Sequence, residues 1–331
     1  MRALVTGATG FLGQHVALRL LAEGVPVRIL ARSTERAKAL ADRGAEVVCG
    51  DVTDAAAVRE AVQGVSLVYH LAGKLFTPGT LPQTYRSTHV DATRILLELC
   101  EDQPQIMRFV HCSTTGVLGV TGDHAADERS PHRPTNVYEQ TKSEAERLVQ
   151  EAGRRGLPTV TVRPGLVYGP GDLHLLGLFR TIEQGVFRPI GRRPVSLHPI
   201  YVDDMTEAFI RCGRDPRAVG ECFHIAGREP TTIAALAATI ADALGVPRPC
   251  GTFPLPLARA AAAVGDALPP NLRQRAPLTR SRLDFLTHSR VYDVTKAREV
   301  VDFAASTDLT LGIQQTVAWY RRERFLTARF P

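Results

Sequence analysis

The chain has 331 residues, of which 44 % are hydrophobic and 22 % charged, a composition typical of a globular enzyme with one large domain or two lobes. No apolar run approaches the ~20 residues of a membrane span, so a transmembrane protein is excluded. The net charge is +6, but no basic block or nucleic-acid motif accompanies it, so we interpret the surplus as an arginine-rich surface that could also attract an anionic ligand.

The cysteines indicate a reducing compartment. The six cysteines are scattered, and none forms a C-x-x-C pair or lies near histidines at zinc spacing. We therefore expect no metal site and mostly core cysteines, which fits a cytoplasmic location. No signal-peptide pattern precedes the first expected strand, which favours the same location.

Strands and helices alternate through the first half of the chain. This alternation predicts an α/β fold, a Rossmann-type doubly wound parallel sheet with helices on both faces. Short apolar runs predict strands at Ala3–Thr6, Val27–Ala31, Glu46–Cys49, Leu67–His70, Arg108–Cys112 and Thr159–Arg163. Helical periodicity predicts helices at Gly13–Glu23, Arg36–Arg43, Ala55–Val62, Leu81–Cys100 and Asn136–Gly153.

The pattern changes after about Gly165, where prolines and short elements dominate. We expect residues 1–165 to form the dinucleotide-binding Rossmann domain. Residues 166–331 are expected to form mainly a smaller substrate-binding lobe, with room for segments that return to the Rossmann core. Helices are predicted here at Leu175–Gln184, Asp203–Cys212, Thr232–Leu244, Leu257–Ala267 and Leu311–Phe325.

A glycine-rich turn, Thr6-Gly-Ala-Thr-Gly-Phe-Leu-Gly13, joins the first expected strand to the first helix. Gly7 allows a tight turn, Gly10 lets the backbone approach a pyrophosphate, and Gly13 lets the helix pack close to the strand. The N–H groups of that helix would then face the phosphates. The residues expected to bind the cofactor here are Gly7, Thr9, Gly10, Phe11, Leu12 and Gly13.

The end of the second strand predicts which dinucleotide binds. An acidic side chain there would bind a ribose 2′-hydroxyl and repel a 2′-phosphate, but Val27–Ser33 contains no acid. Arg32 can pair with a 2′-phosphate, Ser33 can donate its hydroxyl, and Arg36 follows one turn later. The alternative is a solvated Arg32 that stacks on adenine. We expect NADP(H) in preference to NAD(H).

Two further turns are expected to contact the cofactor. Asp51 and Val52 follow the third strand, where a carboxylate can accept a hydrogen bond from the adenine amino group. Leu71, Ala72 and Gly73 follow the fourth strand and offer small residues where the backbone must approach the middle of the cofactor.

A tyrosine and a lysine indicate the chemistry. Tyr138 and Lys142 are four residues apart, on one face of an expected helix. A free tyrosine has a pKa of about 10, and a nearby ammonium with an oxidised nicotinamide favours its phenolate. Tyr138 could then exchange a proton with a secondary alcohol or a carbonyl. Thr114, after the fifth strand, can hold the substrate oxygen, although Ser113 and Thr115 offer the same hydroxyl.

These motifs, in this order and spacing, resemble the extended short-chain dehydrogenase/reductase superfamily. That branch contains nucleotide-sugar epimerases and dehydratases, 3β-hydroxysteroid dehydrogenases and dihydroflavonol reductases. The resemblance covers almost the whole chain. It is carried by TGATGFLG (Thr6–Gly13), GDV (Gly50–Val52), YHLAG (Tyr69–Gly73), CSTTGVLG (Cys112–Gly119), YEQTK (Tyr138–Lys142), RPGLVYGPGD (Arg163–Asp172) and HPIYVDD (His198–Asp204).

The resemblance implies specific roles. Thr114 takes the Ser/Thr position of the family, Tyr138 is the acid/base, and Lys142 also holds the nicotinamide ribose. Pro164 and Gly165 would line the nicotinamide. The family is mostly dimeric, which implies a homodimer through the helices that contain Leu81–Cys100 and Tyr138–Lys142.

Three positions depart from the family. His89 replaces an asparagine that helps to position the active site, and it is either a proton relay or, as we favour, a space-filling residue. Val117-Leu-Gly119 lacks an aromatic substrate contact. Leu197-His-Pro199 replaces an arginine–acid pair of sugar-nucleotide enzymes, which argues against a nucleotide-sugar substrate.

The favoured function is an NAD(P)-dependent oxidoreductase that transfers hydride between nicotinamide and a secondary alcohol or ketone. One alternative is a nucleotide-sugar 4-epimerase with tightly bound NAD, against which the lack of an acid at Ala31 or Arg32 argues. Another is a non-catalytic redox sensor, against which the retained Tyr138 and Lys142 argue. The expected partner is a small-molecule substrate of unspecified identity, with no nucleic acid and no membrane.

Overall fold

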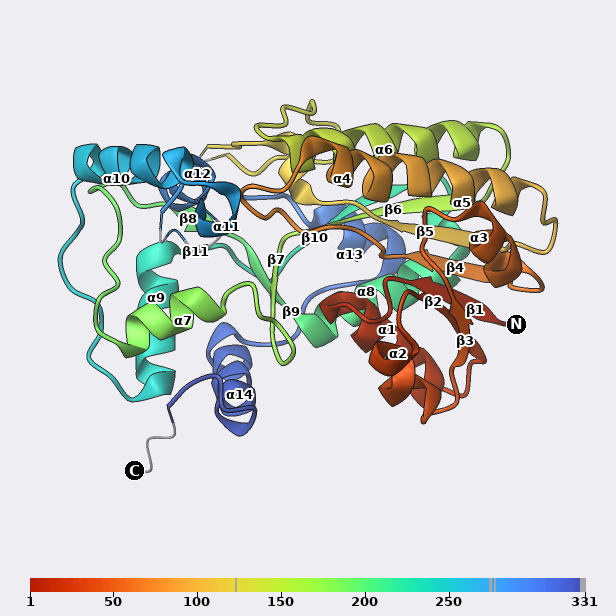
Figure 1. Ribbon diagram of the computed structural model, residues 1–331, viewed down its shortest axis with the longest axis horizontal. Coiled ribbons are helices and arrows are strands. Elements are labelled where there is room, and N and C mark those ends of the chain that lie inside the picture. The colour runs from red at the N-terminus through yellow and green to blue at the C-terminus, as the bar shows by residue number, and fades with distance from the viewer. Residues whose placement is uncertain (123, 274–275, 277, 328–331) are drawn as a thin grey trace.

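The computed structural model describes residues 1–122, 124–273, 276 and 278–327 (Figure 1). At its centre is a seven-stranded sheet in the order β10-β6-β5-β4-β1-β2-β3, and every pairing in it is parallel. Its strands are β1 (Ala3–Thr6), β2 (Val27–Ala31), β3 (Glu46–Cys49), β4 (Leu67–His70), β5 (Arg108–Cys112), β6 (Thr159–Pro164) and β10 (Cys222–Ile225). The Rossmann-type prediction is confirmed, and the first six strands lie where the apolar runs indicated.

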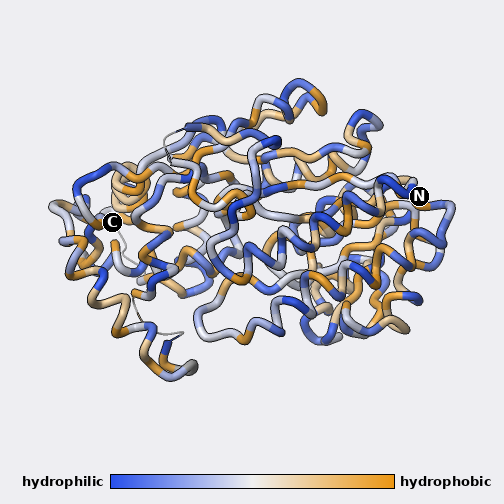
Figure 2. Tube along the Cα trace, turned by 90° about the horizontal axis from the view of Figure 1, so that it is seen from above, coloured by the Kyte–Doolittle hydropathy of each residue, from blue (hydrophilic) through white to orange (hydrophobic). Residues whose placement is uncertain are grey.

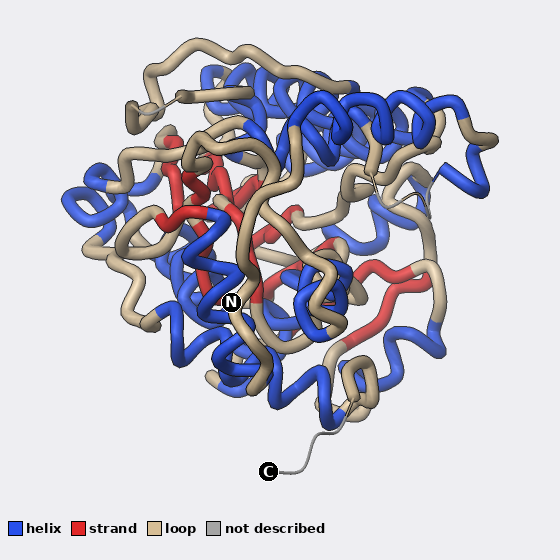
Figure 3. The backbone as a smooth tube through the Cα atoms, turned by 90° about the vertical axis from the view of Figure 1, so that its left-hand side faces the viewer, coloured by secondary structure: helices blue, strands red, loops and turns tan. Residues whose placement is uncertain are grey.

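Helices cover both faces of this sheet, as Figure 3 shows from the end of the smaller lobe. One face carries α1 (Phe11–Ala22), α2 (Thr34–Ala41), α8 (Val202–Arg214) and α13 (Thr295–Val301), which share one apolar core. The other carries α3 (Ala55–Val62), α5 (Ala92–Glu101) and α6 (Val137–Arg154), which bury Val58, Leu96 and Val149 together. Burial on both faces explains why these strands read as continuous apolar runs.

The expected helix at Leu81–Cys100 is divided into three parts. α4 (Pro82–Arg86) leads into a π-helical turn, η1 (Ser87–Asp91), and α5 continues from there. A π-turn inserts one extra residue into a helix and often marks a functional site. Here it carries His89 into the protein, where the residue is buried.

The second half of the chain contributes to the sheet. β10 pairs with β6, with Phe223 beside Val162, and α8 packs on the neighbouring strands. A helix was expected near α8, but no strand was expected at 222–225. This segment has only four residues, the last three of them buried, and it shows neither alternation nor a helical period, so its pattern alone does not distinguish a strand.

A smaller lobe lies beyond the carboxyl ends of the strands (Figure 1). Its core contains Phe179, Ile240, Ile313 and Tyr320. Its helices are α7 (Leu176–Glu183), α9 (Ile233–Leu244), α10 (Leu255–Ala267), α11 (Pro270–Arg273), α12 (Arg280–Thr287) and α14 (Leu309–Arg322). Several short elements were not predicted. They are the strands β7 (Leu166–Tyr168), β8 (Ser196–Leu197), β9 (Pro199–Tyr201) and β11 (Thr231–Thr232), and the 3₁₀ turns η2 (Thr115–Leu118) and η3 (Pro216–Ala218).

Within the described residues, no helix is both long enough and apolar enough to cross a membrane.

Candidate active site

The glycine-rich turn has no space for side chains. Gly7 has φ +73°, and a Cβ on it would lie 2.7 Å from the backbone nitrogen of Ala72. A Cβ on Gly13 would overlap the carbonyl of Gly7. Gly10 donates its N–H to Gly7 at 2.9 Å, and no side chain caps the N-terminus of α1. The uncapped helix end and bare backbone fit the pyrophosphate of a dinucleotide. Thr9, Phe11 and Leu12 lie partly exposed beside this turn.

The end of β2 presents a basic surface. The Arg32 side chain is 74 % exposed and lies 3.7 Å from Asp51 Oδ2. Asp51 Oδ1 accepts hydrogen bonds from the Thr53 N–H at 2.9 Å and from its hydroxyl at 2.8 Å. Ser33 accepts the N–H of Arg36 at 3.3 Å, which leaves its own hydroxyl hydrogen available. Asp51 thus closes its own turn and faces Arg32, while its neighbour Val52 is partly exposed.

The turn after β4 meets the lysine of α6. A Cβ on Gly73 would lie 3.3 Å from Lys142 Nζ and 3.5 Å from His89 Nε2. Leu71 and Ala72 precede Gly73 and are partly exposed. The turn after β4, Lys142 and the π-turn therefore converge at one place beyond the strand ends, where ligands of this fold bind.

Lys142 is buried and held by a backbone carbonyl. Its Nζ donates a hydrogen bond to the oxygen of Cys112 at 2.8 Å. Burial lowers the pKa of Lys142, since the ammonium loses hydration there. Its charge lies at the end of β5, close to the residues that precede Thr114.

The three adjacent hydroxyls have different partners. Ser113 Oγ donates to Glu146 Oε2 at 2.7 Å, and Thr115 Oγ1 donates to the carbonyl of Pro164 at 2.9 Å. Thr114 Oγ1 accepts the N–H of Gly116 at 3.0 Å, and the Thr114 hydroxyl lies close enough to the phenol of Tyr138 to lower the pKa of that phenol. Of the three residues that the sequence left open, Thr114 is therefore the one adjacent to Tyr138. Pro164 is buried and Gly165 partly exposed beside them.

Tyr138 is half-buried near the N-terminus of α6. Burial raises the pKa of Tyr138 above its ordinary value, while the nearby Thr114 hydroxyl opposes this shift. The phenol is therefore protonated at neutral pH. The expectation that Lys142 and an oxidised nicotinamide together favour the phenolate concerns the cofactor complex and stays a prediction. A protonated phenol is the form that donates a proton to a carbonyl oxygen.

Aromatic rings surround Tyr138. The ring of His89 lies edge-on at 5.4 Å between centroids, and that of Tyr85 lies edge-on at 6.3 Å. Phe76 stacks on Tyr85 at 6.4 Å. Tyr85 was not among the predicted site residues, although its position four residues before His89 on one helical face was a signal.

The hydrogen bonds of His89 define its tautomer. Thr141 Oγ1 donates to the carbonyl of Val137 or Tyr138, at 2.9 and 3.0 Å, so it accepts from His89 Nδ1 at 2.8 Å. His89 Nε2 lies 3.0 Å from the backbone nitrogen of Lys74 and 3.1 Å from its carbonyl oxygen, and with Nδ1 as the donor to Thr141 we assign Nε2 as the acceptor of the Lys74 N–H. Burial and the charge of Lys142 lower the pKa of His89 to about 2, which keeps the ring neutral. A space-filling role alone does not describe this residue, since it links α6 to the turn after β4.

A second buried histidine anchors the same turn. Thr93 donates its hydroxyl to the carbonyl of His89 at 2.5 Å and so accepts from His70 Nε2 at 2.9 Å. His70 Nδ1 then accepts from the Thr6 hydroxyl at 2.8 Å, and Thr6 Oγ1 accepts the N–H of Ala72 at 3.3 Å. The turn after β4 is thus held at Lys74 by His89 and at Ala72 by Thr6, whose hydroxyl is in turn positioned by the neutral His70.

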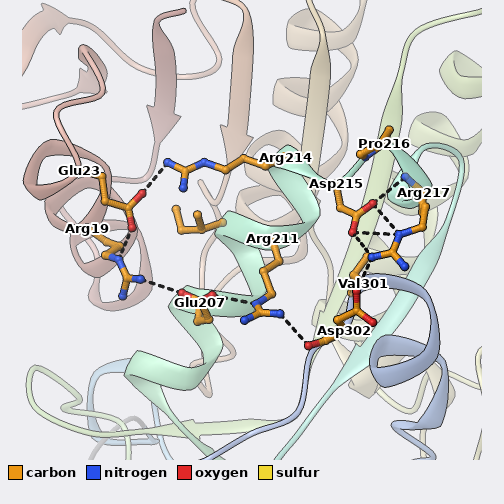
Figure 4. A pocket seen from close by; sticks show the side chains of 11 residues that line it. Arg19, Glu23, Glu207, Arg211, Arg214, Asp215, Pro216, Arg217, Val301 and Asp302 are labelled. Carbon is orange, nitrogen blue, oxygen red and sulfur yellow. Dashed lines mark hydrogen bonds and ion pairs between the residues drawn. The ribbon is translucent and has the colours of Figure 1, made fainter.

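An open pocket of about 550 Å³ lies away from this site, between α1, α8 and α13 (Figure 4). Its arginines are matched by carboxylates. Glu207 accepts from both Arg19 and Arg211 at 2.8 Å, and Arg217 pairs with Asp302 at 2.6 Å. Because positive and negative charges balance there, we assign no ligand to this pocket.

Comparison with known proteins identifies the family. The model of the NAD dependent epimerase/dehydratase family matches residues 3–226, and the chain belongs to this family. A 4-hydroxy-2-methyl-3-oxo-4-farnesyl-3,4-dihydroquinoline-1-oxide ketoreductase of Stigmatella aurantiaca is 29 % identical over 95 % of each chain. A 3 beta-hydroxysteroid dehydrogenase/Delta 5-->4-isomerase of Mycobacterium tuberculosis is 31 % identical over 74 % of this chain and 70 % of that one.

The fold is shared with solved structures. A UDP-glucuronic acid 4-epimerase from Bacillus cereus, in complex with NAD, superposes with a TM-score of 0.77 at 21 % identity, over 98 % of this chain and 99 % of that one. The resemblance to the extended short-chain dehydrogenase/reductases is confirmed. The protein is thus an NAD(P)-dependent enzyme of the oxidoreductase or epimerase type.

Proposed function

We propose that this family member reduces a ketone to a secondary alcohol, or catalyses the reverse reaction, with Tyr138 as the acid/base. The observation that carries the proposal is the position of the Thr114 hydroxyl beside the protonated phenol of Tyr138, whose ring lies 5.4 Å from that of His89. The hydroxyls of Ser113 and Thr115 have buried partners of their own, so Thr114 and Tyr138 offer the converging donors for one substrate oxygen. The ketoreductase from Stigmatella aurantiaca supports the reductive direction for this chain.

A bound nicotinamide would supply the hydride to the carbonyl carbon. Tyr138 donates its phenolic proton to the carbonyl oxygen, so the carbonyl gains a hydride and a proton and becomes an alcohol. Thr114 orients the same oxygen. The ammonium of Lys142 lies beside Gly73, where the cofactor would pass, so Lys142 would hold the nicotinamide ribose. Its positive charge also stabilises the phenolate that remains on Tyr138 after proton transfer.

We propose that the cofactor is NADP(H). Arg32 is exposed just after β2, Arg36 is exposed in the first turn of α2, and the Ser33 hydroxyl hydrogen between them is available to a phosphate. Arg32 forms an ion pair with Asp51. Asp51 follows β3, whereas an acid that binds the ribose 2′-hydroxyl lies at the end of β2. A 2′-phosphate would replace Asp51 as the partner of Arg32.

Three further proposals concern the whole protein. Residues 166–331 supply most of the substrate pocket, since the smaller lobe lies beyond the strand ends. Two chains associate through α4, α5 and α6, which would appear as twice the mass of one chain in light scattering at micromolar concentration. The protein functions in the cytoplasm, which the six free cysteines support.

The test of the reaction is Tyr138→Phe, with Tyr85→Phe as the matched control. Tyr85 lies beside Tyr138, but its hydroxyl is engaged with the backbone N–H of Thr77 at 2.7 Å. With NADPH and a set of ketones, Tyr138→Phe should lower turnover by ~10²–10⁴ and leave NADPH affinity nearly unchanged. Tyr85→Phe should change turnover by less than about threefold. Equal turnover in wild type and Tyr138→Phe would refute the assignment.

The family name also includes epimerases, and the cofactor of the purified protein separates the two functions. An epimerase retains NAD through purification, because it returns the hydride to its own substrate. A reductase exchanges its cofactor and consumes one NADPH for each ketone. Protein that carries tightly bound NAD and turns over no NADPH would favour the epimerase.

A further inference from the structure

Helix α10 of the smaller lobe has an apolar face directed away from the protein. Its buried face consists of small residues, Ala258, Ala262 and Gly265, near α12. On the outward side, Leu257 is 58 % exposed and Val264 is 65 % exposed. The residues around these two on the same side are exposed alanines, namely Ala260, Ala261, Ala263 and Ala267.

The apolar surface continues past both ends of the helix. Phe253 is 39 % exposed before α10, and Leu272 is 47 % exposed after it. Between Phe253 and Leu272 the only charged residues are Arg259 and Asp266. Figure 2 shows orange, hydrophobic residues along the helices at the end of the molecule that holds the smaller lobe. Exposed apolar side chains gathered on one side of a helix mark an interaction site more often than a free surface.

Arginines border this surface. The backbone of Phe253 is hydrogen-bonded on either side of Ile190: its N–H donates to the carbonyl of Pro189 at 2.8 Å, and its carbonyl accepts the N–H of Gly191 at 2.9 Å. The exposed Arg192 and Arg193, which follow Gly191, therefore lie near Phe253. Arg259 is exposed on α10 itself. No ion pair of these three arginines occurs within the described residues. Asp266 is 3.6 Å from Arg280, so its charge is already matched.

We propose that α10 lies on the surface of an anionic lipid bilayer, with Leu257 and Val264 in the acyl boundary and the arginines at the headgroups. An apolar helix face with basic residues at its edge is the pattern of interfacial helices. A second copy of this chain fits less well, because a two-fold contact would bring the unpaired arginines of both copies together. The 13-residue helix is about 20 Å long, too short to span a bilayer. The proposal concerns the membrane surface and differs from our sequence-based expectation of no membrane partner.

Vesicle binding tests the proposal. The full-length protein is mixed with vesicles of phosphatidylcholine alone, or with about one third phosphatidylglycerol, and binding is measured by co-sedimentation. Wild type should bind the anionic vesicles and lose binding at high salt, where arginine–headgroup attraction is screened. Leu257→Ser with Val264→Ser should weaken this binding about tenfold or more, because two apolar side chains no longer leave water. Arg192→Glu with Arg193→Glu should weaken it similarly.

Val219→Ser is the matched control, since Val219 is 46 % exposed in the loop between η3 and β10, outside this surface. It should bind as wild type does, and all variants should keep the wild-type melting temperature. Absence of wild-type binding, or equal binding to neutral vesicles, would overturn the proposal. Light scattering gives a second outcome that would overturn the proposal. If only the Leu257/Val264 variant had the mass of a single chain, a second copy of the chain would be what covers this face.

Discussion

His89 Nδ1 and the hydroxyl of Thr141 are joined by a hydrogen bond of 2.8 Å, which fastens the π-turn to the residue before Lys142. The other ring nitrogen of His89 accepts the N–H of Lys74, the residue after Gly73. One imidazole thus fixes both sides of the place where Lys142 and Gly73 meet. The polar atoms of an asparagine share one carbon, so the family residue spans a shorter distance than the imidazole does.

His89→Leu should therefore impair turnover more than folding. The leucine fills a similar volume but leaves the N–H of Lys74 without its partner, at a cost of ~1–3 kcal/mol. If that cost falls on the active arrangement, turnover should decrease about tenfold or more, while NADPH affinity changes less. His89→Asn should restore part of the turnover. Steady-state kinetics with separate kcat and KM checks this, and a leucine variant with wild-type kcat would show that His89 merely fills space.

Glu146 and Arg163 form a buried ion pair beneath the site, and both side chains are nearly inaccessible. Burial alone would raise the pKa of Glu146, but the nearby His132 ring, the hydrogen bonds and charge of Arg163 and the hydrogen bond from Ser113 lower it below its ordinary value. Because the folded pKa is depressed, the stabilisation is present above the unfolded pKa of about 4.3 and is lost as pH falls through the folded value.

Glu146→Gln should accordingly destabilise the protein by ~3–5 kcal/mol at neutral pH, because it leaves the Arg163 charge uncompensated in the interior. The measurement is the urea-induced unfolding free energy at neutral pH. The double variant Glu146→Gln with Arg163→Met should recover part of that loss, since no buried charge remains. A double variant as unstable as the sum of the two single variants would contradict this explanation.

The features that could be predicted from the sequence are those set by residues close together in the chain. The glycine turn and the first six strands have local signals, and they lie where we expected. The choice among Ser113, Thr114 and Thr115 depends on Glu146 and on the Pro164 carbonyl, which are 33 and 49 residues away from their partners. β10 was missed for the same reason, because it becomes a strand by pairing with β6.

Arg32→Asp tests the cofactor proposal. If the guanidinium pairs with a 2′-phosphate, the wild type should bind NADPH more tightly than NADH. Replacing Arg32 by aspartate removes a charge-assisted hydrogen bond and adds a like charge beside Asp51, which should cost ~2–4 kcal/mol of NADPH binding. Fluorescence titration measures both affinities, and NADH affinity should change much less. Equal wild-type affinity for the two cofactors would rule out this role of Arg32.

The pH dependence of turnover should differ between the two reaction directions. Reduction needs the protonated phenol of Tyr138, and burial raises the pKa of that phenol above its ordinary value. The protonated form therefore persists as pH rises, and kcat for reduction should stay nearly constant from about pH 6 to pH 9. Oxidation of the product alcohol needs the phenolate, so its kcat should increase with pH over the same range.

Both directions are measured at saturating NADP⁺ or NADPH, and Tyr138→Phe provides the control. In that variant, the residual kcat for oxidation should no longer increase with pH, since the phenylalanine ring has no proton to exchange. A decline of the reductive kcat with a midpoint near pH 7 would contradict a raised pKa for Tyr138. That result would place the proton donor on another group, and the position of Thr114 beside Tyr138 would then be structural.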